Sequence, residues 1–149
     1  MDKKPPDARF TVVTLGVADV GASSRFYEAL GFVRKMRATG DAVAFLHTGG
    51  SVLALYPWDK LAEDAQVPDQ PRPQAFRGAT LAWNCSSRSE VDAAMAHALA
   101  VGGRPVKAPH PTSYGGYSGY FADPDGHLWE IVVAPGLLVT EDGLLTVPD

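Results

Sequence analysis

An internal repeat constrains the fold of this chain more than any other feature of its sequence. Residues 10–57 show the pattern of a strand, a helix and three short strands, and residues 79–134 repeat that pattern in the same order. One such module would leave a face of its sheet uncovered. Two modules side by side can place their helices outside and enclose a concave mixed sheet. The sequence therefore predicts an α+β fold built from two βαβββ modules in one chain.

The first module begins with a β-branched run over residues 10–17, which predicts a strand. Asp19 is suited to cap a helix over residues 20–30, where apolar side chains recur at helical spacing. Gly31 can adopt the positive φ that commonly follows a helix. Three short strands are expected next, over residues 32–37, 42–47 and 52–56.

The second module follows the same order, with a strand over residues 79–85 and a helix over residues 89–101. The helix is preceded by a capping box that runs from Ser87 to Glu90. A tight turn is expected at residues 123–126, because Pro124 presets φ and the following Gly accepts a positive φ. Further strands are expected over residues 104–108, 119–123 and 128–134.

Three segments flank these modules. Residues 1–9 form an N-terminal tail, residues 58–78 a proline-rich linker with a short helix-like piece, and residues 135–149 a C-terminal arm. Residues 10–134 together are expected to make one domain. The apolar pattern of the arm is compatible with a hairpin or an arm on a partner subunit, and equally with a surface strand that covers a sheet edge.

Composition narrows the function classes. The net charge of −4 and the scattered basic residues speak against a nucleic-acid binder. Cys85 is the single cysteine, so no disulfide can form within the chain, and its apolar surroundings predict a buried thiol. No apolar run approaches the ~18 residues of a membrane span, and the first residues lack the apolar core of a signal peptide. A cytoplasmic location is expected.

Two segments resemble the vicinal oxygen chelate superfamily, the glyoxalase and bleomycin-resistance proteins. Residues 14–32 carry a strand, Asp19, a Phe-Tyr pair on the helix and a Leu-Gly-Phe exit. Residues 119–133 carry the Asp-Pro-Asp-Gly turn that leads into a strand with Glu130. With the repeat, the resemblance covers about residues 10–134. It is specific for the fold and weak for the reaction, because one fold hosts many chemistries.

The resemblance implies four positions that usually hold a divalent metal, one on each of four strands. These positions correspond to Val12, Leu53, Thr80 and Glu130. Only Glu130 is a competent ligand, because Val and Leu carry no donor atom and a lone hydroxyl holds Zn²⁺ or Ni²⁺ poorly. We therefore expect no cofactor, and a divalent metal is not supported by these positions.

Strand parity then assigns the remaining cavity residues. If the side chain of Val12 points into the cavity, that of Thr14 does too. Val13 and Leu15, which alternate with them, then point toward the helix. By the same rule Thr80 and Asn84 line the cavity, and Trp129 and Ile131 pack in the core beside Glu130. The cavity is predicted to be mostly apolar, as ligand pockets are. Burial there should raise the pKa of Glu130, which makes it the candidate catalytic base.

The segment over residues 109–117 is read as a loop at the cavity mouth. It carries His110, Tyr114 and Tyr117, which are candidates for ligand contact, and its glycines would allow movement. His47 is a weaker candidate at the cavity rim. The remaining histidines, His97 and His127, are predicted on a solvated helix face and at a turn or strand entry.

Three functions stay open. The leading one is a protein that binds a small organic molecule without metal, either sequestering it or acting on it. The second is a metal-dependent lyase or dioxygenase of the same superfamily. The third is a non-catalytic interaction module that uses its sheet as a contact surface. The resemblance also implies a homodimer, with no nucleic-acid or membrane partner.

Overall fold

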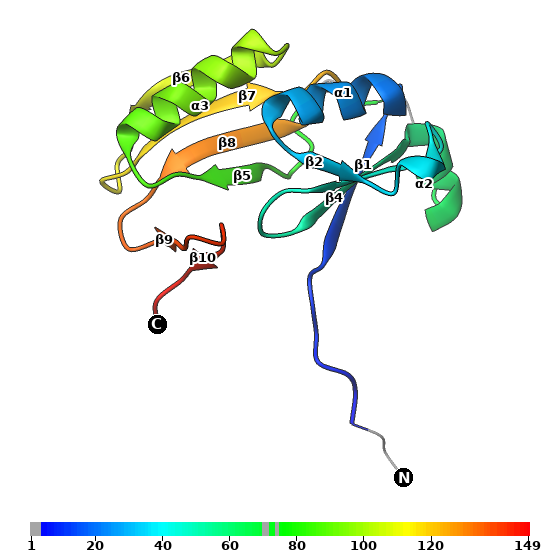
Figure 1. Cartoon of the computed structure of the whole chain (residues 1–149), viewed down its shortest axis with the longest axis horizontal. Coiled ribbons are helices and arrows are strands. Elements are labelled where there is room, and N and C mark those ends of the chain that lie inside the picture. Colours follow the sequence, from blue (N-terminus) through cyan, green and yellow to red (C-terminus); the bar gives the residue numbers. More distant parts are fainter. Residues whose placement is uncertain (1–3, 70–71, 74) are drawn as a thin grey trace.

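The strands pair into two four-stranded mixed sheets, one from each half of the chain (Figure 1). The computed structural model describes residues 4–69, 72–73 and 75–149. In the first half the elements are β1 (Val12–Val17), α1 (Val20–Leu30), β2 (Val33–Lys35), a 3-10 turn (Arg37–Thr39), β3 (Ala44–His47), β4 (Val52–Pro57) and α2 (Trp58–Ala65). In the second half they are β5 (Leu81–Asn84), α3 (Arg88–Ala100), β6 (Arg104–Pro111), β7 (Tyr117–Ala122) and β8 (Leu128–Val133).

The repeat predicted from the sequence is confirmed in the order of the strands. The first sheet runs β1-β4-β3-β2 and the second runs β5-β8-β7-β6. In each sheet the first strand pairs in parallel with the last one, and the other pairs are antiparallel. The α+β architecture of two βαβββ modules is therefore present, as two separately hydrogen-bonded sheets.

Helix ends follow the predicted caps. The Asp19 carboxylate accepts a hydrogen bond from the Ala22 amide at 2.9 Å, and Gly31 follows α1 with φ of 127°. The Ser87 hydroxyl accepts from the Glu90 amide at 3.1 Å at the start of α3. Each cap satisfies an amide that the helix leaves without a partner.

Helices α1 and α3 lie on the same side of the two sheets (Figure 1). We call this side of each sheet the helix-covered face and the opposite side the open face. Apolar side chains from both modules form one core on the helix-covered face, and Phe26 and Tyr27 of α1 reach across to Phe121 and Trp129 of the second module. The core is thus shared, which makes the two modules one packing unit.

The Asp123–Gly126 turn ties the second module to the first through hydrogen bonds. The Tyr27 hydroxyl donates to Asp123 Oδ2 at 2.6 Å and accepts from Trp129 Nε1 at 3.0 Å. The Ala18 amide donates to Asp125 Oδ1 at 2.7 Å. Burial, followed by the nearby Asp123 charge, raises the pKa of Tyr27 well above its usual value, so this hydroxyl stays a donor. Burial also raises the pKa of Asp123.

Two short strands, β9 (Leu138–Val139) and β10 (Leu145–Thr146), make the C-terminal arm a hairpin on its own chain. The tip of this hairpin lies against the β3–β4 turn of the first module. A Cβ added to Gly50 would lie 3.3 Å from the Gly143 carbonyl oxygen. Among the described residues, no helix is long and apolar enough to cross a membrane.

Candidate functional site

The open face carries most of the residues predicted to line a cavity. In the first sheet Val12 pairs with Val52 and Thr14 pairs with Ala54, and their side chains share this face. In the second sheet Ala82 pairs with Glu130, and Asn84 pairs with Val132. Thr80 precedes β5 and is exposed. Their neighbours Leu15, Trp129 and Ile131 lie in the core on the helix-covered face.

The placement of Leu53 in the cavity is wrong by one residue. Leu53 is 1% exposed and belongs to the core on the helix-covered face. The open-face position is Ala54, which holds the third place in β4 as Glu130 holds the third place in β8. The error arises because β4 is apolar on both faces, so its sequence has no alternation to reveal which side chains face inward.

The four metal positions do not fit a divalent ion. With Ala54 in place of Leu53, the set still contains one carboxylate, one hydroxyl and two aliphatic side chains. Among the described residues, no three His, Cys, Asp or Glu side chains gather closely enough to hold a metal. A single carboxylate cannot compete with water for Zn²⁺ or Ni²⁺. We therefore derive no chemistry through a metal at this position.

Glu130 is half-buried on the open face, and its carboxylate has one hydrogen-bond partner among the residues that the structure describes. The Tyr120 hydroxyl, from the neighbouring strand β7, donates to Glu130 Oε2 at 2.9 Å. Burial, and then this hydrogen bond, raises the pKa of Tyr120. The phenol therefore stays protonated and leaves the second carboxylate oxygen of Glu130 able to accept a hydrogen bond or a proton from a bound molecule.

The segment over residues 109–117 differs from the predicted mouth loop. Strand β6 extends to Pro111, and His110 pairs with Ser118 as part of the second sheet. Tyr117 lies on the helix-covered face, where its hydroxyl donates to Asp92 Oδ1 at 2.6 Å, so it is not a ligand contact on the open face. Tyr114 remains in the turn and is 56% exposed.

A larger cavity of about 400 Å³ opens beside the first strand. Thr14 and Gly16 of β1 form one side, and α2 with the proline-rich linker forms the other. Its walls are mostly apolar, which is the usual composition of a small-molecule pocket. The complete lining consists of Thr14, Leu15, Gly16, Trp58, Leu61, Ala62, Ala65, Val67, Pro68, Pro73 and His127.

Trp58, the first residue of α2, anchors a group of cationic and aromatic side chains. Its ring lies 5.0 Å from the Arg72 guanidinium and 5.1 Å from that of Arg77, and it stacks on His127 at 6.1 Å. Cation–π contacts of this kind contribute about 0.5–1 kcal/mol at exposed sites. These contacts hold the linker against the turn of the second module.

His127 has a tautomer dictated by its neighbours. Its Nε2 lies 2.8 Å from the Gly16 carbonyl oxygen, which can only accept, so Nε2 carries the hydrogen. Its Nδ1 lies 3.1 Å from Arg77 Nη1, which can only donate, so Nδ1 accepts. His127 therefore links β1 to Arg77 through its two ring nitrogens.

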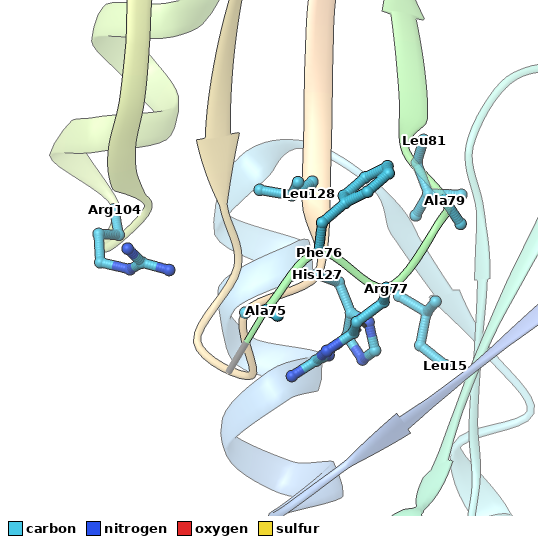
Figure 2. A pocket seen from close by; sticks show the side chains of 10 residues that line it. Leu15, Ala75, Phe76, Arg77, Ala79, Leu81, Arg104, His127 and Leu128 are labelled. Atoms are coloured by element: carbon cyan, nitrogen blue, oxygen red, sulfur yellow. Dashed lines mark hydrogen bonds between the residues drawn. The ribbon is translucent and has the colours of Figure 1, made fainter. Parts of the chain in front are cut away.

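A smaller cavity of about 200 Å³ lies on the other side of His127 (Figure 2). In Figure 2, Arg77 lies against His127, Phe76 lies by Leu128, and Arg104 stands apart at the start of β6. Leu15 and His127 line both cavities and separate them. The complete lining consists of Leu15, Ala75, Phe76, Arg77, Ala79, Leu81, Arg104, Gly126, His127 and Leu128.

Of the site residues predicted from the sequence, only Thr14 lines either of these two cavities. Sequence reasoning did not single out Arg77 or Arg104, it favoured core packing over a cavity role for Trp58, and it read His127 as a turn or strand-entry residue. The available signal was the pair Arg72 and Arg77 in a proline-rich linker next to a tryptophan, since a solvated linker has no need of these side chains. Arg77 contacts His127 across 50 positions, and His127 contacts Gly16 across 111, which spacing along the chain does not reveal.

Comparisons with known proteins agree with the fold of the chain. The profile of the Glyoxalase/Bleomycin resistance protein/Dioxygenase superfamily matches residues 9–131. A solved structure of a glyoxalase-related enzyme from Fulvimarina pelagi is 35% identical, with a TM-score of 0.82 over 95% of this chain and 99% of that one. Among curated proteins, no match to the chain is found.

Two further structures share the fold. A glyoxalase/bleomycin resistance protein/dioxygenase from Nocardioides is 26% identical, with a TM-score of 0.73 over 91% of this chain and 92% of that one. A lactoylglutathione lyase from Agrobacterium tumefaciens is 24% identical, with a TM-score of 0.62 over 87% of this chain and 96% of that one. At that identity the lyase supports the fold alone.

Proposed function

Because the chain belongs to the Glyoxalase/Bleomycin resistance protein/Dioxygenase superfamily, we propose that it binds a small organic molecule beside the open face without a divalent metal. The observation that carries this proposal is the larger cavity of about 400 Å³, which reaches Thr14 and Gly16 on the open face. Most of its walls are aliphatic or aromatic, so they favour an uncharged, largely apolar ligand. The Thr14 hydroxyl supplies a polar contact to orient it.

Glu130 has a separate part in this proposal. It is the carboxylate on the open face of the second sheet, and Tyr120 fixes one of its oxygens at 2.9 Å. Glu130 lines neither cavity. We propose that it accepts a hydrogen bond or a proton from a molecule that extends over the open face of the second sheet, as a tethered base rather than a metal ligand. The other three positions implied for metal ligands carry two aliphatic side chains and one hydroxyl, so Glu130 is not expected to act by binding a metal.

The proposal includes a homodimer in the cytoplasm. Exposed apolar side chains at both ends of the chain support an association surface, with Phe10 80% exposed and Leu138 68% exposed. Light scattering at micromolar concentration is expected to give twice the chain mass, and a monomer mass would contradict the dimer.

The binding test uses Nile red, an uncharged dye whose fluorescence increases in apolar surroundings. Ala62→Phe places a ring in the larger cavity and is expected to abolish the signal. Ala96→Phe, on the exposed face of α3, is the matched control and is expected to leave binding unchanged. Equal dye binding by both variants would overturn the assignment of the cavity.

Metal independence is tested on the same purified protein. Elemental analysis after dialysis should find no stoichiometric metal, and Zn²⁺, Ni²⁺, Mn²⁺ or Fe²⁺ should not raise the melting temperature. Nile red binding should be unchanged by a chelator. A metal content near one per chain would overturn the metal-free assignment and favour a metal-dependent lyase or dioxygenase.

A further inference from the structure

We propose that the smaller cavity is a second binding site, selective for an organic anion with an apolar body, such as a monocarboxylate. It lies between the linker, the start of β6 and the start of β8 (Figure 2). This site is separate from the larger cavity and does not depend on the function proposed for it.

The charges on its walls have one sign. Arg77 and Arg104 line the cavity, and no Asp or Glu does among the described residues. The positive charge of these walls contrasts with the net charge of −4 on the whole chain. Within the described part of the chain, neither arginine has a carboxylate within 4.0 Å. Their positive charge is thus available to an anion in the cavity.

The neighbouring Arg72 shows the contrast. Its guanidinium lies 3.6 Å from Asp125 Oδ1, and Asp125 also accepts the Ala18 amide. The Asp125 side chain, which is 7% exposed, is thus engaged with Arg72 and with the Ala18 amide. Arg77, by contrast, contacts Asp125 through its backbone carbonyl oxygen and forms no ion pair with it.

Arg77 is held in place before any ligand arrives. It donates to His127 Nδ1 at 3.1 Å and to the Asp125 carbonyl oxygen at 2.8 Å, and it lies over the ring of Trp58. A guanidinium has five N–H donors, so donors remain for a ligand. Because its side chain is already ordered, binding an anion costs little further conformational entropy.

The remaining walls select against a small inorganic anion. Leu15, Leu81, Leu128 and Phe76 present apolar surface to the cavity. Phosphate or sulfate would lose its hydration against these side chains without compensation. A carboxylate with an aliphatic or aromatic body can place its charge at the arginines and its body on the apolar walls.

The test is calorimetric titration of the full chain at low ionic strength with hexanoate, hexanol, hexylammonium and inorganic phosphate. Hexanoate is expected to bind at one per chain, and each of the other three at least roughly ten-fold more weakly, since a charge-assisted hydrogen bond is worth more than one factor of ten. Equal binding of hexanol would overturn the role of charge. Equal binding of phosphate would overturn the role of the apolar walls.

Arg104→Gln tests the site within the protein. It should weaken hexanoate binding roughly ten-fold, because Arg104 is exposed and its loss should not disturb the core. Lys107→Gln, an exposed residue of the same strand outside the cavity, is the matched control. Equal loss in both variants would mean that hexanoate responds to general surface charge, and this would overturn the site.

Two cavity-filling variants separate this proposal from the function proposed above. Ala79→Trp fills the smaller cavity and should abolish hexanoate binding while Nile red still binds. Ala62→Phe fills the larger cavity and should have the opposite effect. Melting temperatures close to that of the parent protein establish that each variant is folded. Loss of hexanoate binding in Ala62→Phe with retention in Ala79→Trp would overturn the assignment of the anion to the smaller cavity.

Discussion

The two faces of the sheets carry different kinds of residue in both modules. On the helix-covered face, Leu53 and Leu55 of β4 and Trp129 and Ile131 of β8 are all at most 5% exposed and belong to one core. On the open face the third residue is Ala54 in one module and Glu130 in the other. The repeat thus keeps its apolar character where helices pack and varies where they do not.

This difference explains how a chain can keep the fold of its superfamily without a fitting set of metal ligands. Packing in the core restricts side chains to a narrow range of size and polarity. The open face lies outside this shared core, although Ala54 and Val132 are buried on it. An aliphatic side chain there can therefore replace a metal ligand without disturbing the packing of the helices. The face that decides the fold is therefore a poor guide to the chemistry on the other face.

The sharpest test of the comparison uses two neighbouring strands. Leu53→Ala on the helix-covered face should lower the free energy of unfolding by about 2–5 kcal/mol, because it removes buried methyl groups and leaves a cavity. Val12→Ala on the open face, where Val12 is 41% exposed, should change it by less than about 1 kcal/mol. Urea denaturation measures both. Similar losses in the two variants would mean that the faces are not distinguished by packing.

A smaller effect is expected at the hydrogen bonds between the modules. Tyr27→Phe removes the hydroxyl that donates to Asp123 and accepts from Trp129 Nε1, and both partners are buried. We expect a loss of about 1–3 kcal/mol in the free energy of unfolding. Tyr56→Phe, a half-buried tyrosine on the open face of β4, is the control and should be nearly neutral. If Tyr27→Phe left the free energy of unfolding unchanged, the hydrogen bonds of Tyr27 would not contribute to holding the modules together.

The Asp123 carboxyl should make stability depend on pH. Burial raises its pKa in the folded protein above the value of about 3.9 typical of an unfolded chain. Its contribution is therefore fully present below pH ~4 and is lost as the pH rises through the folded pKa. Urea denaturation between pH 3.5 and 7 should show this decline, and Asp123→Asn should reduce it. Asp59→Asn on exposed α2 should not, and identical slopes in all three proteins would contradict the assignment.

The smallest effect is expected at the polar pair on the open face. Tyr120→Phe removes the hydrogen bond to Glu130 Oε2, but both side chains are half-buried and water can replace the partner. The free energy of unfolding should therefore fall by only about 0.5–1 kcal/mol. Thermal melts of Tyr120→Phe and Glu130→Gln measure it. A loss as large as that of Tyr27→Phe would show that the open face is structurally constrained as well.

The sequence was most informative where one pattern excluded the alternatives. Alternation along β1, β5 and β8 predicted that Thr14, Asn84 and Glu130 share one face, away from core residues such as Leu15, Trp129 and Ile131. Their part in binding a ligand stays a prediction. Alternation failed in β4, where apolar residues occupy both faces, and at Tyr117, where glycines in the preceding turn obscured the start of a strand. The two cavities were beyond its reach, because α2 and the linker are positioned by contacts with distant residues.

The bond between Tyr27 and Asp123 joins residues 96 positions apart, and this separation has a consequence during synthesis. A ribosome that adds about 5–20 residues per second makes Asp123 roughly 5–20 s after Tyr27. Throughout that interval Phe26 and Tyr27 of the first module have no Phe121 or Trp129 to pack against. The nascent first module thus presents an aromatic surface to the cell until its second half emerges, and these seconds are the period in which a chaperone would protect it from aggregation.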